Sequence, residues 1–163
     1  MSANTLKKEY AFFWSNKSPF SNWYPCRIDM DEVTFNCAEQ AMMYHKALLF
    51  EDDEAADRIM KAETPRDQKA LGRSVKNFDQ SIWEKHRERI VYDILFAKFS
   101  QNADLQKALL DTGDAKLVEA SSMDRIWGIG LAEDDPRAHD ESKWLGMNLL
   151  GKLLTRLKET LYY

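Results

Sequence analysis

Residues 32–50, with the sequence EVTFNCAEQAMMYHKALLF, decide the fold class because a strand passes directly into a long helix there. The β-branched and aromatic run VTF is typical of a strand, and Asn36 is a plausible helix N-cap. Phe35, Met42 and Leu49 then recur at helical spacing, which predicts a helix with one apolar face. A strand next to an amphipathic helix favours a mixed α and β architecture.

The rest of the chain also contains sequence signals for both helices and strands. Thr64 and Asp79 are predicted helix caps, and Pro65 suits the first position of a helix. Strands are predicted at residues 10–15, in a hairpin over 26–35 and at 115–120; further helices are predicted at 51–62, from Pro65 to near Gly72, at 80–99, at 104–111 and at 142–163.

The length of the chain and its lack of repeats and linkers predict one domain. The 163 residues are enough for one sizeable hydrophobic core, and the sequence contains no internal repeat and no linker. We therefore expect a compact single domain over residues 1–163, with its core at about residues 10–160. Its class is α+β, with several helices packed around a small, mostly antiparallel sheet.

Composition excludes several classes of protein. A formal net charge of −4 argues against a protein that coats nucleic acid through bulk positive charge, although a local basic cleft stays open. Cys26 and Cys37 are too few for a disulfide scaffold. The start of the chain has no apolar signal region, and no run has membrane-spanning length. We expect a cytoplasmic protein, with the nucleus as the alternative, and no membrane or obligate protein partner.

Glu39 and Lys46 interrupt the apolar face of the first helix. At about 100° per residue, both side chains project within roughly 40° of the centre of that face. An isolated buried charge costs several kcal/mol, so a cleft that opens onto this face would explain the pair. A desolvated lysine can act as a nucleophile and a nearby carboxylate can shuttle protons, which suits attack on a sugar carbon with an imine intermediate.

Two structural interpretations compete with this chemistry. Asn36 and Glu39 have the spacing of a capping box, in which Glu39 would accept the Asn36 backbone N–H. Lys46 could extend its ammonium past its apolar neighbours to water. The pattern alone leaves both open.

A basic row follows in residues 64–76, where Arg66, Lys69, Arg73 and Lys76 recur at three- and four-residue steps. Such a row can bind phosphate, and Arg73 beside a glycine is the best candidate. A solvated basic helix face is the alternative.

The segment 118–130, VEASSMDRIWGIG, combines an acid, hydroxyls and two glycines. Glycines allow backbone amides to approach an anion, and Trp127 can stack on a base, although a tight turn under a buried tryptophan explains the pattern equally well. Ser21 and Asn22 bind a ligand or cap turns, and Trp83 by default packs in the core. Asn148 among leucines needs a hydrogen-bond partner, and no histidine pair has metal-ligand spacing, so no metal or cofactor is expected.

Six blocks resemble the NADAR family, also called YbiA-like proteins, and occur in the family's order over roughly residues 12–157. They are FWSNKSPFSNWYP, FNCAEQAMMYHKALLF, ETPRDQKALGRSV, ILFAKFSQNADLQKALLDTG, LVEASSMDRIWGIG and WLGMNLLGKLL. The resemblance implies a YbiA-like fold and an N-glycosidase that cuts the bond between ribose C1 and a nitrogen.

The resemblance also assigns roles to residues. It implies that Lys46 forms a Schiff base with an opened ribose and that Glu39 is its acidic partner. It implies a ligand cleft that contains Asn22, Arg73, Trp83, Asp124 and the WGIG block with Trp127, Gly128 and Gly130. The residue patterns add Ser21, Lys69, Glu119, Ser121 and Asn148 to the predicted ligand-binding set.

Two substrate classes follow from the resemblance. One is ADP-ribose attached to guanine, in DNA, RNA or a free nucleotide, and the sequence favours this class. The other is the early ribosylamino-phosphate intermediates of riboflavin synthesis. A non-catalytic ADP-ribose-binding module remains an alternative from a different functional class.

Overall fold

The computed structural model describes residues 9–162, and its contacts divide the chain into two compact units. Of the described residues, unit 1 contains 9–21 and 107–162, whereas unit 2 contains Asn22–Gln106. Each unit is described by itself below. The prediction of one domain over residues 1–163 stays a prediction, and Tyr163, the predicted end of the last helix, lies outside the described residues.

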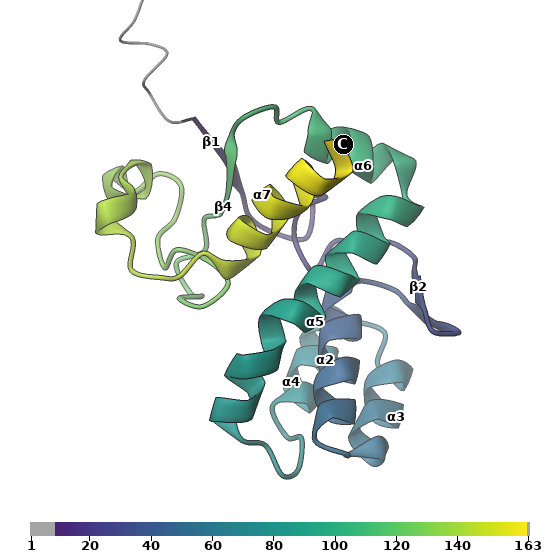
Figure 1. Cartoon of the computed structure of the whole chain (residues 1–163). Helices are drawn as coiled ribbons and strands as arrows, with labels where there is room; N and C mark the ends of the chain where they lie inside the picture. Colours follow the sequence, from purple (N-terminus) through teal and green to yellow (C-terminus); the bar gives the residue numbers. More distant parts are fainter. Residues whose placement is uncertain (1–8, 163) are drawn as a thin grey trace, which may run out of the picture. The chain divides into compact units, whose positions relative to one another are not determined.

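Unit 2 is a hairpin followed by a group of helices (Figure 1). Helix α2 packs against α3, α4 and α5, so it is the central helix of this unit. The strands are β2 (Ile28–Met30) and β3 (Val33–Phe35), and the helices are α2 (Ala38–Leu49), α3 (Asp53–Lys61), α4 (Pro65–Gly72) and α5 (Gln80–Gln101).

Unit 1 joins the beginning of the chain to its end. Strand β1 (Tyr10–Phe13) runs parallel to β4 (Lys116–Glu119), and α7 (Leu149–Tyr162) packs on β4. Two short 3₁₀ helices, η1 (Pro136–His139) and η2 (Glu141–Lys143), precede α7. Helix α6 (Ala103–Leu110) contains the sequence boundary between the two units.

The α+β class is confirmed, but the strands differ from the predicted arrangement. Among residues 9–162 they form two separate two-stranded ladders, of which β2–β3 is antiparallel and β1–β4 is parallel. Parallel strands need a long crossover connection, and the helical chain between β1 and β4 supplies it. A local hairpin pattern predicts β2–β3, whereas no local pattern predicts the direction of β1 relative to β4.

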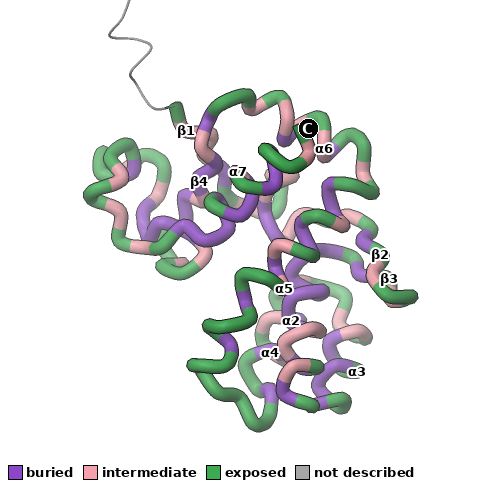
Figure 2. The backbone as a smooth tube through the Cα atoms, viewed as in Figure 1, coloured by how far each residue is buried: buried purple, intermediate pink, exposed green. Residues whose placement is uncertain are grey.

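Each unit has its own buried centre (Figure 2). In unit 2, Phe35, Ile59 and Phe99 come from a strand and two helices and are almost fully buried. In unit 1, Val118 and Ile129 lie in a buried cluster against which Tyr10, Phe12 and Trp144 pack. These cores fix α2, which carries Glu39 and Lys46, and β4, which ends at Glu119.

Local sequence signals explain several helix ends. Thr64 accepts the Asp67 backbone N–H at the start of α4, and Asp79 accepts those of Ser81 and Ile82 at the start of α5, as predicted. The predicted N-cap of α2 is wrong, because the cap residue is Cys37. The Asn36 side chain instead donates to the Glu63 carbonyl and accepts from Gln68.

The last helix begins later than predicted, at Leu149 instead of Ser142. The backbone N–H groups of Leu145, Met147 and Asn148 donate to carbonyls of the 125–129 loop, so they do not belong to a helical ladder. Asn148 also has a left-handed backbone with a φ of 52°. This pairing of two loops overrides the helical pattern of the leucines.

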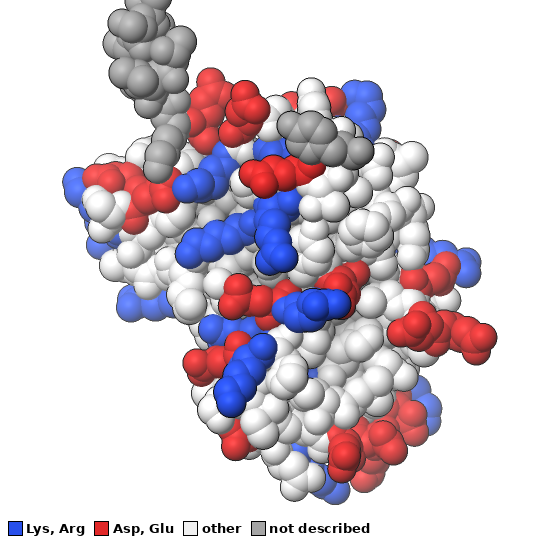
Figure 3. Space-filling view, viewed as in Figure 1, with Lys and Arg blue, Asp and Glu red and all other residues white. Residues whose placement is uncertain are grey.

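Surface charges are mixed. On the face in view, acidic and basic side chains alternate over the surface (Figure 3). Within residues 9–162, no helix has the length and hydropathy needed to cross a bilayer.

Candidate functional site

Glu39 lies in the first turn of α2 and is only 4% exposed. Its backbone N–H donates to the Asn22 carbonyl over 2.9 Å. The Asn36 N–H donates to the Gln40 side chain over 2.8 Å, so Gln40 and not Glu39 fills the role expected of a capping box. The capping explanation for Glu39 is therefore wrong, and the positive end of the helix dipole favours its negative charge.

Lys46 lies two turns further along α2, in its last turn. Its Nζ lies 4.6 Å from the centre of the Phe78 ring and 5.7 Å from that of Trp83. Trp83 is 8% exposed, and Phe78 also contacts Phe50, with 5.2 Å between ring centres. The ammonium therefore lies against aromatic faces, where a cation–π attraction holds it.

The surroundings of Lys46 change its acidity. Burial lowers the pKa of Lys46 below the ordinary 10.5, and the nearby negative charge of Glu39 partly opposes this effect. The positive charge of Arg73 lowers the pKa of Lys46 further. A lower pKa increases the fraction of neutral amine, which is the nucleophilic form.

Arg73 reaches this neighbourhood through a close contact between two helices. At Gly72, the last residue of α4, a Cβ would overlap the Met43 side chain of α2. Only glycine lets α4 approach α2 so closely. Arg73 follows directly as the C-cap residue, and its backbone N–H donates to the Lys69 carbonyl.

The predicted basic row is shorter than its sequence suggests. Helix α4 ends at Gly72, because the N–H and hydroxyl of Ser74 both donate to the Leu71 carbonyl. Lys76 lies beyond the helix and forms an ion pair with Glu54 over 3.8 Å. Arg73 is exposed and Lys69 is half-buried, so these two remain the candidates for phosphate.

Asn22 is 7% exposed and is tied to α2 through its carbonyl. Its side-chain oxygen Oδ1 is buried and has no hydrogen-bond partner among the described residues. A buried acceptor without a partner is rare in folded proteins, so this atom is suited to a donor on a ligand. Ser21, the preceding residue, belongs to unit 1 and its N–H donates to the Ser18 carbonyl.

In unit 1, the loop after β4 is held by its own side chains. Asp124 accepts the backbone N–H groups of Ile126 and Trp127, each over 2.9 Å. The Ser121 hydroxyl accepts the Met123 N–H. Both side chains therefore shape the turn, and Trp127 lies half-buried at its end.

Two positions of this loop require glycine, each for a different physical reason. Gly130 has a φ of 73°, a conformation that disfavours other residues. A Cβ on Gly128 would lie 3.0 Å from the carbonyl oxygens of Asp124 and Glu119 and 3.3 Å from Oε2 of the Glu119 carboxyl group. Gly128 thus makes room for the end of β4, where Glu119 is located.

Asn148 finds the partner that its apolar surroundings require. It is fully buried, its Oδ1 accepts the Glu119 N–H and its Nδ2 donates to the Leu117 carbonyl, each over 3.1 Å. Its side chain therefore joins the start of α7 to β4. A ligand role for Asn148 stays a prediction.

The predicted site residues thus form two groups, one in each unit. In unit 2, Glu39, Lys46, Arg73 and Trp83 come together around one face of α2, with Asn22 bonded to the backbone of Glu39. In unit 1, Glu119, Asp124 and Gly128 lie together around the end of β4, with Asn148 behind them.

Sequence reasoning missed two residues near α2. Phe78 lies in the loop before α5, and its contact with Lys46 has no sequence signal. Lys98 is fully buried in α5, and burial lowers its pKa to about 8. Its spacing of four and three residues from Ile94 and Leu95 could have placed it on the buried face of the helix.

Comparison with known proteins places this geometry in a family. Residues 12–162 match the NADAR domain. The chain belongs to the NADAR family. This match covers both groups of candidate residues, in unit 1 and in unit 2.

Named relatives of this NADAR chain include glycosidases. It is 44% identical to N-glycosidase R617 of Acanthamoeba polyphaga mimivirus, over 93% of this chain and 95% of that protein. It is 33% identical to N-glycosidase YbiA of Escherichia coli (strain K12), over 87% of this chain and 80% of that protein. These relationships support N-glycosidase activity.

Comparison with solved structures gives the same family relationship. The NMR structure of E. coli YbiA matches with a TM-score of 0.78 and 29% identity, over 96% of this chain and 87% of that one. The fold is therefore YbiA-like, as predicted. A further relative, riboflavin biosynthesis protein VVA0006 of Vibrio vulnificus (strain YJ016), is 30% identical over 90% of this chain but only 36% of its own length.

Proposed function

We propose that the protein is an N-glycosidase that removes ADP-ribose from ADP-ribosylated guanine through a covalent intermediate on Lys46. The observation that carries this proposal is the placement of Lys46 against Phe78 and Trp83, on the same helix as the buried Glu39. A binding module has no need for an amine whose pKa is lowered by burial.

The reaction requires the neutral amine of Lys46. Glu39 first takes the ammonium proton of Lys46, which leaves a neutral amine and a carboxylic acid. The lone pair of the amine then forms a bond to ribose C1, and the bond from C1 to the guanine nitrogen breaks while Glu39 passes that proton to the nitrogen. The ribose ring then opens to an imine on Lys46. Water adds to the imine, and the sugar leaves as its free aldehyde while the amine is restored. No metal or redox step is part of this proposal.

The phosphates of the substrate are assigned to Arg73 and Lys69. A guanidinium binds two phosphate oxygens at once, and Arg73 is exposed at the end of α4. The buried Oδ1 of Asn22 would accept a hydrogen bond from a ribose hydroxyl, which would satisfy an otherwise unpaired acceptor.

A second candidate substrate is a ribosylamino-phosphate intermediate of riboflavin synthesis. The similarity to riboflavin biosynthesis protein VVA0006 favours this alternative. The same amine and acid would cut its C1–N bond, so the candidate residues in unit 2 do not separate the two substrates.

A side-by-side turnover assay tests the proposal. Purified protein is incubated with DNA that carries ADP-ribosylated guanosine and, separately, with the ribosylamino-pyrimidine phosphate. We expect release of ADP-ribose from the DNA, with Lys46→Ala as the inactive control. Cleavage of only the pyrimidine phosphate would favour the second substrate. Tight binding of ADP-ribose in calorimetry, without turnover of either substrate, would favour a binding module.

A further inference from the structure

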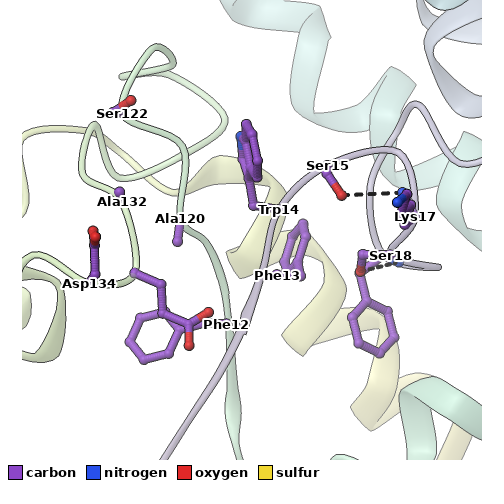
Figure 4. A pocket seen from close by; sticks show the side chains of 12 residues that line it. Phe12, Phe13, Trp14, Ser15, Lys17, Ser18, Ala120, Ser122, Ala132 and Asp134 are labelled. Atoms are coloured by element: carbon purple, nitrogen blue, oxygen red, sulfur yellow. Dashed lines mark hydrogen bonds between the residues drawn. The ribbon is translucent and has the colours of Figure 1, made fainter.

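Unit 1 contains a hollow of about 850 Å³ that the proposed reaction does not use. One wall is the end of β1 and the turn after it, and the opposite wall is the loop that contains Ala120 and Ser122 (Figure 4). Ligand pockets in proteins commonly have a volume of roughly 300–1,000 Å³, so a small molecule fits here. Every residue that lines the hollow belongs to unit 1, so its walls are complete within that unit.

Aromatic side chains form much of the wall. Phe13 and Phe20 line the hollow and contact each other edge to face, with 5.8 Å between their ring centres. Trp14 also lines the hollow, directly after β1, and is 65% exposed, so a large aromatic ring is open to solvent. The face of a tryptophan ring attracts a cation more strongly than the face of any other aromatic side chain.

An acidic turn borders the same hollow. Glu133 and Asp134 line it and are the central residues of a turn, which the Asp135 N–H closes by donating to the Ala132 carbonyl over 3.0 Å. Both carboxylates are exposed, and neither forms an ion pair with another described residue. Asp135, by contrast, pairs with Arg137 over 2.8 Å. Two negative charges are therefore available to a ligand at the edge of the hollow.

His139 connects the acidic turn to the aromatic wall. The centres of the His139 and Phe12 rings are 4.9 Å apart, and Phe12 lines the hollow. The other side of the same imidazole approaches the turn, because its Nε2 lies 3.3 Å from the Glu133 carbonyl oxygen. The aromatic rings and the carboxylates thus belong to one continuous surface.

These walls favour one class of ligand. Lys17 also lines the hollow, so two carboxylates and one ammonium give its charged groups a net negative charge, which disfavours phosphates. A strongly hydrated metal ion gains little from aromatic walls. An alkylated ammonium suits both features, because its CH groups pack on an aromatic ring while its charge is attracted by the ring face and by the carboxylates.

We propose that this hollow binds a small organic cation with an alkylated ammonium group, which lies against Trp14 and beside Glu133 and Asp134. The tryptophan supplies a ring face, and the two carboxylates supply the opposite charge. This inference goes beyond the proposed function and does not depend on it, because Glu39 and Lys46 belong to unit 2.

A matched pair of ligands tests the proposal. Choline and its neutral carbon analogue, 3,3-dimethylbutan-1-ol, have nearly the same shape and differ in charge. An NMR titration of the full chain measures the affinity for each ligand. We expect choline to bind about tenfold more tightly than the neutral alcohol. Equal affinities, or no measurable binding of choline, would overturn the proposal.

Variants assign the binding to this hollow. Trp14→Ala should weaken choline binding about tenfold or more, whereas Trp14→Phe keeps an aromatic face and should weaken it less. The double variant Glu133→Gln and Asp134→Asn should weaken binding of choline but not of the neutral alcohol. Phe96→Ala is the control, because Phe96 is a 45% exposed aromatic residue of unit 2, and this variant should bind choline like the unchanged protein. Unchanged choline binding after Trp14→Ala would overturn the assignment to this hollow.

Phosphocholine distinguishes a free cation from a lipid headgroup. It carries the same ammonium close to a phosphate, which Glu133 and Asp134 repel, so it should bind less tightly than choline. The double variant should reduce this difference between the two ligands. Tighter binding of phosphocholine than of choline by the unchanged protein would contradict the role of the carboxylates and overturn the choice of a free cation.

Discussion

The ammonium of Lys46 lies 4.6 Å from the centre of the Phe78 ring. Phe78 is itself 41% exposed, so its ring lies at the surface of unit 2 while it contacts the amine. Burial lowers the pKa of Lys46, and the Phe78 ring is part of the apolar surface that contacts the amine. Several predictions about the reaction depend on this contact.

Replacing Phe78 should change the pH dependence of the reaction. Phe78→Ala admits water to Lys46, and hydration of the ammonium should outweigh the lost cation–π attraction, because burial has the largest effect on the pKa of Lys46. This pKa should therefore rise, and the acidic limb of the kcat/KM profile should move to higher pH. Phe78→Leu keeps an apolar cover and should leave the limb near its original position. A limb that does not move in Phe78→Ala would show that Phe78 does not control the acidity of Lys46.

Replacing Glu39 should move the same limb in the opposite direction. The negative charge of Glu39 raises the pKa of Lys46, so Glu39→Gln should lower it and shift the limb to lower pH. The plateau of kcat should fall roughly 100-fold or more, because the leaving base loses its proton donor. A shift to higher pH would contradict the proposed electrostatic coupling.

Lys98 should make stability depend on pH. It is fully buried and its pKa is lowered to about 8, so the folded protein binds fewer protons than the unfolded chain between about pH 8 and 10.5. The free energy of unfolding, relative to a Lys98→Met variant, should therefore rise by roughly 3 kcal/mol across this window. Urea titrations at several pH values measure this difference.

An exposed lysine provides the control for that experiment. Lys107 of α6 forms a surface ion pair with Asp111, and its side chain is 76% exposed. The free energy of unfolding relative to a Lys107→Met variant should therefore show no comparable rise over the same pH window. If the difference in free energy of unfolding between Lys98→Met and the unchanged protein did not vary with pH, this would contradict the lowered pKa of Lys98.

The contact between Gly72 and Met43 should be visible in stability. Gly72→Ala places a Cβ where the Met43 side chain lies and should destabilise the protein by about 1–3 kcal/mol. Met43→Ala removes that obstacle, so the double variant should be less destabilised than the sum of the two single variants. Strict additivity in urea unfolding would indicate that the two residues do not meet.

Asn148 combines a left-handed backbone with two buried hydrogen bonds. Asn148→Ala loses both bonds and keeps an unfavourable φ, whereas Asn148→Gly loses the bonds but accepts that φ. We expect the alanine variant to be less stable than the glycine variant by about 1 kcal/mol. The reverse order in thermal unfolding would mean that the backbone conformation is not the limiting factor.

Local patterns predicted much of the fold and of the candidate site. Helix caps at Thr64 and Asp79 are local chemistry, and the structure confirms them. The helical period likewise placed Glu39 and Lys46 on one face of α2, because that placement depends only on spacing along a helix.

The remaining features depend on contacts that are distant in sequence. The start of α7 was predicted too early, because residues 145–148 pair with a loop about twenty residues earlier. The parallel direction of β1 and β4 and the cover of Lys46 by Phe78 likewise arise only when separate segments meet. The hydrophobic periodicity of one segment does not predict its contacts with segments that are distant in the sequence.

Reductive trapping on Lys46 tests the central claim most directly. The protein is incubated with ADP-ribosylated guanosine DNA and sodium borohydride, and the peptide that contains Lys46 is analysed by mass spectrometry. An imine on Lys46 predicts a stable ADP-ribosyl adduct at that residue, absent from Lys46→Ala and from reactions without substrate. An unmodified Lys46 in a protein that releases ADP-ribose, together with full turnover by Lys46→Ala, would contradict the account.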